Sequence, residues 1–287
     1  MKKTAIPFLN LLLAAIPFLF GGCIYSSHFQ SPFYGTSEPY HVIPLKSDSM
    51  PSATYASGVF TEGGANDGLR DNVFSFTGSI YRSHNFGHFQ GWYGGNVALG
   101  SYNVGNYSYY NDARPRRLSD SLPATARAGD RFFGGYGAGG GMDFVLPFGR
   151  GSEWRVVGVS FTLQKEFGDY WRFRKNLPDS MADVIFHNNL TGVMGFSTEF
   201  VFRTRHSVIG YKLMLAGDII NGQGRYKGYD SLYESVPFFQ QSLSLTQNRF
   251  TGSFQLNVGN HILNAQLGVS YRLEPKRRPA EYHNRYY

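Results

Sequence analysis

The chain is poor in cysteine and in charge. Cys23 is the only cysteine in 287 residues. A lone cysteine cannot form a disulfide within the chain, which excludes a disulfide-stapled scaffold. Charged residues make up 16% of the sequence, whereas aromatic residues reach 17% and glycines number 35. This balance is unusual for a soluble helical enzyme.

Long apolar runs are also absent beyond the first twenty residues, so we expect no transmembrane helix in the rest of the chain. If the remaining chain enters a bilayer, it must do so as a closed β-barrel. The formal net charge is +7. In an exported protein this charge favours anionic lipid head groups or acidic glycans as partners, and we expect no nucleic-acid partner.

Export is indicated by residues 1–22, which we interpret as a signal peptide. Lys2 and Lys3 precede an almost wholly apolar stretch, and Gly21 and Gly22 stand directly before Cys23. This layout resembles a bacterial lipoprotein signal, in which the cysteine becomes the lipid-carrying first residue of the mature chain. The resemblance implies fatty acyl chains such as palmitate on Cys23 and an anchor in the outer membrane. The alternative is an ordinary signal peptide with an incidental cysteine.

Two segments outside the main domain read as irregular. Residues 23–52 contain four prolines among Ser, Tyr and Thr, and we interpret them as a lipid-anchored linker. Residues 274–287 form a basic C-terminal tail.

Between these segments, residues 53–273 show the period-two alternation of β-strands. In "ILNAQLGVSYRL" (262–273), for example, the apolar residues from Leu263 to Leu273 share one face and polar or small residues share the other. The pattern predicts ten strands, with eight or twelve as alternatives. The expected strands are 53–62, 71–84, 88–103, 131–146, 153–167, 190–203, 208–218, 238–246, 250–258 and 262–273.

Three features favour a membrane barrel over a soluble sandwich. The expected strands are long, short turns alternate with long connections, and the polar face is rich in Gly and Ser, as at Gly135, Gly137, Gly139 and Gly141. Over residues 53–273 the chain thus resembles a bacterial outer-membrane β-barrel. The resemblance implies an all-β, closed antiparallel up-and-down transmembrane barrel of about ten strands.

One ion pair is predicted inside this barrel. If the 204–207 turn is symmetric, Glu199 and Lys212 face each other across a hairpin on the polar face. Such a pair would fill and rigidify a narrow lumen, or it would line a pore.

The long connections interleave aromatic and basic residues, which would contact lipid head groups or bind lipopolysaccharide, a glycan or a protein partner. The candidate residues for this external surface are Tyr109, Tyr110, Arg114, Arg116, Arg117, Trp171, Arg172, Arg174, Lys175, Arg225, Tyr226 and Lys227.

No catalytic constellation, metal-ligand spacing or cofactor motif stands out. The glycines of "GGYGAGGG" (134–141) lack the lysine and the following helix of a phosphate-binding loop. We therefore expect an outer-membrane β-barrel lipoprotein with a structural, surface-binding or assembly role. The alternatives are a barrel enzyme (a protease or a lipid-modifying enzyme, with Asp112, Asp179, Asp183 and His187 in its loops), a narrow channel, and a surface-tethered, carbohydrate-binding β-sandwich.

Overall fold

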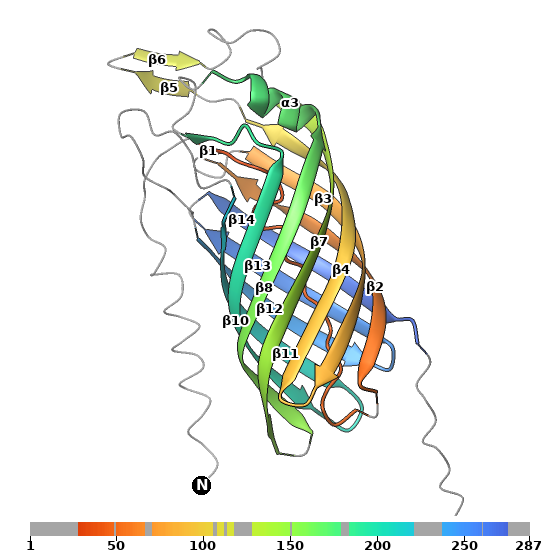
Figure 1. The fold of residues 1–287 in the computed structure, drawn as a ribbon. Coiled ribbons are helices and arrows are strands. Elements are labelled where there is room, and N and C mark those ends of the chain that lie inside the picture. The colour runs from red at the N-terminus through yellow and green to blue at the C-terminus, as the bar shows by residue number, and fades with distance from the viewer. Residues whose placement is uncertain are drawn as a thin grey trace, which may run out of the picture.

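The structure of the chain is a computed structural model (Figure 1). It describes residues 28–48, 50–66, 71–105, 108–111, 114–117, 128–149, 151–178, 184–220, 237–259 and 261–274. The predicted signal peptide with Cys23, most of the basic tail and the candidates Arg225, Tyr226 and Lys227 lie outside these residues.

Ten antiparallel strands form one closed barrel, in which each strand pairs with the next and the last pairs with the first. The strands are β2 (Ser52–Ala65), β3 (Asp71–Phe86), β4 (Phe89–Val104), β7 (Gly129–Phe148), β8 (Ser152–Gly168), β10 (Leu190–Arg203), β11 (Val208–Asp218), β12 (Phe238–Gln247), β13 (Phe250–Gly259) and β14 (Ile262–Arg272). The predicted closed ten-stranded barrel is confirmed. The sandwich alternative is wrong, because a single closed sheet has no second sheet to face.

Short elements lie at one end of the barrel, the end with the long connections (Figure 1). They are β1 (His28–Phe29), β5 (Ser108–Asn111), β6 (Arg114–Arg117), α3 (Asp169–Asn176) and β9 (Val184–Ile185). We call this the α3 end and the opposite one the short-turn end. Within the described residues, no helix is long and apolar enough to cross a membrane.

The outer surface of the barrel is apolar. On β3, the exposed large apolar side chains are Phe74, Phe76, Ile80 and Phe86, and Ile80 is 63% exposed. On β14, Leu267 is 60% exposed, whereas its neighbour Gln266 is only 2% exposed. Apolar side chains thus point outward and polar ones inward, which is the pattern of a barrel that spans a bilayer and the inverse of a soluble protein.

A belt of phenylalanines surrounds the short-turn end. Exposed phenylalanines lie at or beside the short turns, where transmembrane barrels have an aromatic girdle at the membrane interface. They are Phe86, Phe89, Phe148, Phe202 and Phe250. Phe148 and Phe202 come from different hairpins and pack edge to face, with ring centroids 5.8 Å apart.

The predicted linker is wrong for the described part of residues 23–52, because these residues fill the lumen. Residues 28–50, coloured red to orange in Figure 1, run inside the barrel from the α3 end to the short-turn end. Every described residue from 29 to 40 is buried. We call residues 28–50 the plug. Pro32 begins a run of turns at residues 32–37, and Pro39 and Pro44 lie in irregular backbone, where proline restricts φ.

A turn in the plug requires glycine. Gly35 has φ +73°, a left-handed conformation that costs other L-residues about 1–2 kcal/mol. A Cβ at this position would also come within 1.7 Å of Ile262 Cδ1 on the barrel wall. The wall makes room in the same way on β7, where a Cβ at Gly135 would lie 2.4 Å from Phe33 of the plug.

The apolar outer surface generates a depth-dependent prediction. We expect Leu267→Arg, in the middle of β14, to lower the free energy of unfolding in lipid vesicles by about 2–4 kcal/mol, because it places a charge in hydrocarbon. Leu273→Arg, just after β14, is the matched control and should cost about 0–1 kcal/mol. Equal costs at the two positions would contradict this placement of the bilayer.

Candidate functional site

A buried ion pair lies in the half of the lumen near the short turns. Arg155 Nη1 of β8 donates to Glu199 Oε2 of β10 at 2.5 Å, and both side chains are at most 4% exposed. Tyr40 of the plug donates its hydroxyl to Glu199 Oε1 at 2.6 Å. Arg155 also donates to the carbonyl of Ile43 at 3.0 Å and to Gln90 Oε1 at 2.9 Å. Barrel wall and plug therefore share one charged network.

A β-bulge in β8 turns Arg155 inward. Gly158 pairs with Ser197 and Arg155 pairs with Glu199, so three steps along β8 match two steps along β10. The extra residue reverses the alternation between Arg155 and Val157, which points outward. Arg155 and Gly158 are consequently both buried although they are three residues apart.

The structure pairs Glu199 with Arg155, whereas the sequence predicts a pair with Lys212. Glu199 and Lys212 are cross-strand neighbours in the register, and Glu199 is buried in the lumen as expected. The ion pair of Glu199 is nevertheless formed with Arg155, on the strand at its other side. Lys212 is only partly buried. Strict alternation along β8 puts Arg155 on the same outward face as Val157, and the bulge instead turns Arg155 into the lumen.

Hydrogen bonds from the barrel wall satisfy the backbone of the plug. Asn257 Nδ2 and Asn264 Nδ2 donate to the carbonyl of Gly35 at 2.8 and 3.3 Å, and Gln255 Nε2 donates to the carbonyl of Glu38 at 3.0 Å. Further donors to plug carbonyls are Ser83 to Val42, Gln90 to Pro44 and Gln266 to Thr36. The amide-rich inner faces of β13 and β14 are the sequence signal for such an occupant, because amides can complement a buried backbone.

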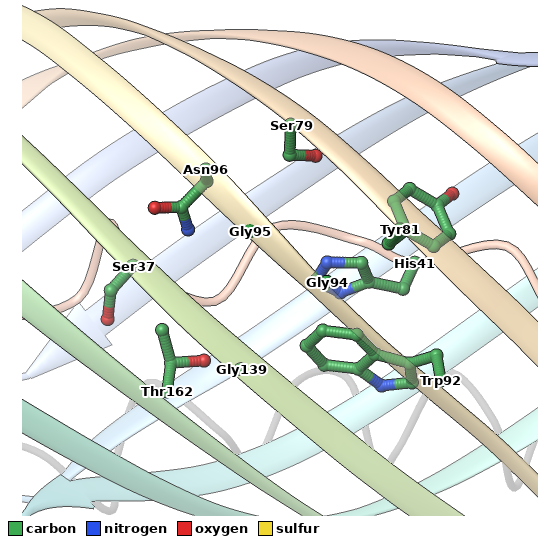
Figure 2. Close-up of a pocket in the computed structure, with 10 residues that line it drawn as sticks. All are labelled: Ser37, His41, Ser79, Tyr81, Trp92, Gly94, Gly95, Asn96, Gly139 and Thr162. Carbon is green, nitrogen blue, oxygen red and sulfur yellow. The ribbon is translucent and has the colours of Figure 1, made fainter.

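An aromatic cluster closes the middle of the lumen. His41 of the plug stacks on Trp92, with ring centroids 3.5 Å apart, and meets the edge of Tyr81 at 4.7 Å (Figure 2). Ser37 Oγ and Asn96 Oδ1 line the same small cavity without a hydrogen-bond partner among the described residues. The free space fits about one water molecule. Among the described residues at this level, the plug and the wall leave room for little more than that water.

A second buried ion pair fixes the plug at the α3 end. Arg174 of α3 pairs with Glu166 of β8, and both side chains are fully buried. Ser31 of the plug donates to Glu166 Oε2 at 3.0 Å, and Tyr170 donates its hydroxyl to the carbonyl of Gln30 at 3.1 Å. Burial raises the pKa of the Tyr170 phenol well above its ordinary value, which keeps this donor protonated.

Of the candidate surface residues on α3, one is buried and the others are at least partly exposed. Arg174 is unsuited to the role that we assigned to it, because it is enclosed between Glu166 and the carbonyl of Phe186. Arg172 and Lys175 are exposed on the same helix, and Lys175 Nζ lies 5.2 Å from the Trp171 ring centroid. These three residues keep the composition of a site for anionic or sugar groups.

The remaining described candidates lie on a two-stranded hairpin. In the register of β5 with β6, Tyr109 stands opposite Arg116, and Tyr110 stands opposite Pro115. Arg114 and Arg117 lie on β6. The backbone thus places aromatic and basic positions on one hairpin.

The described residues contain no group of three or more His, Cys, Asp or Glu side chains suited to a metal ion. Of the four loop residues considered for a barrel enzyme, the structure describes only His187, which is exposed and whose carbonyl accepts a hydrogen bond from Trp171 Nε1. The site of interest is therefore the plugged lumen and the α3 end above it.

An apolar outer surface, a polar interior and alternating connections define the chain as an outer-membrane β-barrel. No family model and no curated protein matches the sequence. Among solved structures, the translocator domain of the autotransporter NalP from Neisseria meningitidis is 10% identical with TM-score 0.41, covering 80% of this chain and 91% of that one.

Two further solved structures show likenesses of the same kind. Neisserial surface protein A (NspA) is 9% identical with TM-score 0.31, covering 78% of this chain and 96% of that one. The KdgM porin is 8% identical with TM-score 0.27, covering 77% and 99%. Similarity at this level carries no argument about the role of this chain.

The Arg155–Glu199 pair can be tested by a double-mutant cycle. Glu199→Gln should lower the free energy of unfolding by about 3–5 kcal/mol, because it leaves Arg155 as an uncompensated buried charge. Adding Arg155→Met to Glu199→Gln should recover part of this loss. Urea unfolding in lipid vesicles measures both effects.

The matched control for this cycle is Asp48→Asn. Asp48 pairs with Arg203, but their side chains are 30% and 32% exposed, so the expected loss is only about 0–1 kcal/mol. A double variant that loses the sum of the two single losses would contradict a coupled pair.

Proposed function

We propose that this protein is an outer-membrane barrel kept closed by its own N-terminal plug, and that it acts through the surface at its α3 end. The observation that carries this proposal is the packing of the lumen. The plug is buried at residues 29–40 and 42–45, both ion pairs hold it in place, and the cavity beside His41 fits about one water molecule. A lumen filled in this way supports a structural or surface-binding role over permanent transport.

The surface available for binding is supported by α3. Trp171, Arg172 and Lys175 combine an aromatic face with exposed cations, and the buried Arg174–Glu166 pair holds the helix on the barrel. The chemistry fits lipopolysaccharide phosphates or an acidic glycan, with arginine pairing phosphate and the indole stacking on sugar. Surrounding outer-membrane lipids are the first partners within reach of this rim.

We also propose that Cys23 carries a lipid. The support is the signal-like stretch before it, with its two lysines, apolar run and paired glycines. Two or more acyl chains would give a stable second attachment to the membrane.

A narrow channel that opens by release of the plug is the second candidate. The wall behind the plug is polar, and much of it consists of uncharged amide and hydroxyl side chains that water could solvate. Its residues include Gln90, Gln240, Ser242, Gln255, Asn257, Asn264 and Gln266.

Conductance in a planar bilayer separates these two roles. We expect the full chain to be nearly silent and a variant without residues 29–45 to conduct steadily, because water would then fill the polar lumen. The shortened variant must still run faster unboiled on a gel, as a closed barrel does. Large steady conductance of the full chain would overturn the proposed closed barrel and support the channel.

Lipid attachment has its own test. Cys23→Ala should abolish lipid attachment and leave the precursor unprocessed at this site, because the cysteine supplies the thiol to which the lipid is joined. Mass spectrometry of the mature N-terminus measures both results. An unmodified cysteine in the native protein, or cleavage elsewhere, would end the lipoprotein proposal.

A further inference from the structure

The first end of the plug is fixed at the α3 end of the barrel. His28 and Phe29 pair in parallel with Val184 and Ile185 of β9. Phe29 packs edge to face against Phe173 of α3, with ring centroids 5.6 Å apart. These contacts and the Ser31–Glu166 hydrogen bond all involve elements above or at the α3 end of the wall.

The last residues of the plug are fixed at the opposite end. Lys46 donates its backbone N–H to Glu153, at the beginning of β8, and Asp48 pairs with Arg203, at the end of β10. Both strands meet short turns there. The plug therefore runs through the whole lumen with one polarity, and its first residue lies at the α3 end.

In the part of the barrel that the structure describes, the lumen has no room for a second segment of backbone beside the plug. Residues 29–40 are all buried, and the free space beside them in the middle of the barrel fits about one water molecule. A second pass of backbone needs far more room than that. A return along the outside would expose an irregular polar backbone to hydrocarbon, which bilayers do not tolerate.

The residue that follows the last strand, Glu274, lies at the short-turn end of the barrel. Glu274 follows β14 and accepts a hydrogen bond from the backbone N–H of Thr54, near the start of β2, at 2.6 Å. β2 begins beside the end of the plug, so residue 274 lies at the short-turn end. The described chain thus begins at the α3 end, with His28, and finishes at the short-turn end, with Glu274.

We infer that the plug crosses the outer membrane inside the barrel, so that His28 lies on the outer face of the membrane while Glu274 lies on the periplasmic face. The inference rests on the proposed function for one step only, the orientation with short turns toward the periplasm. It assigns the plug a second role besides closing the lumen, which is to carry the start of the described chain across the membrane to the surface at α3.

Single introduced cysteines and a membrane-impermeant maleimide test this topology in intact cells. Ser27→Cys reports on the stretch before the plug. Asp169→Cys, on exposed α3, and Arg205→Cys, in an exposed short turn, are the matched controls for the two ends. The unmodified chain is measured beside them to account for Cys23, and each variant must keep its heat-dependent gel mobility.

We expect Ser27→Cys and Asp169→Cys to be labelled as fully in intact cells as after permeabilisation, and Arg205→Cys to gain its label only after permeabilisation. A cysteine at position 27 that stays unlabelled in intact cells while Asp169→Cys is labelled overturns the inference and leaves the proposed function intact. Labelling of Arg205→Cys but not Asp169→Cys in intact cells reverses the barrel and overturns both. Equal labelling at both ends before permeabilisation also refutes both, because no membrane then separates them.

Discussion

The need to satisfy a buried, irregular backbone governs the rest of this structure. A strand segment bonds to its neighbours, but beyond β1 the described residues of the plug belong to no sheet, and their backbone carbonyls accept hydrogen bonds from side chains of the surrounding wall. Asn257 and Asn264 supply two of these donors to Gly35, and Gln255 supplies another to Glu38. An amide wall and an aromatic, proline-containing plug are therefore complementary features, and each explains the composition of the other.

Charge is handled by the same principle. Arg155 lies in a dry environment and uses its guanidinium to join a carboxylate on β10 with a carbonyl of the plug. An isolated buried charge would lower the free energy of unfolding, so the contributions of Arg155 and Glu199 to stability depend on each other. The pair links the position of the plug to the positions of β8 and β10. The bulge in β8 is what turns Arg155 toward Glu199 and the plug.

The barrel itself could be predicted from local alternation, because lipid-facing and lumen-facing positions differ in polarity at every second residue. Glu199 could be placed inside by this parity. Arg155 could not be placed inside in this way. The sequence "EWRVVGVS" gives no sign of the β-bulge, and the bulge moves Arg155 from the outward face, where strict alternation puts it, to the inward face. The plug could not be predicted for another reason. Its residues have neither strand nor helix periodicity, and prolines such as Pro32 and Pro44 fit a tether as well as an extended occupant. Only the wall, through its amides, distinguishes the two.

The pairing of β14 with β2 has a consequence for how the molecule is made. The plug precedes β2 in the chain and lies within the ring that these two strands close. A finished ring could admit it only by drawing a polar chain end lengthwise past two charged pairs. A plug that is already in position when β14 pairs with β2 meets no such barrier, because the pairing of these two strands is the step that encloses it. Pairing of β14 with β2 before the plug is in position would yield an empty ring, so the order of assembly, as well as the final contacts, decides which product forms.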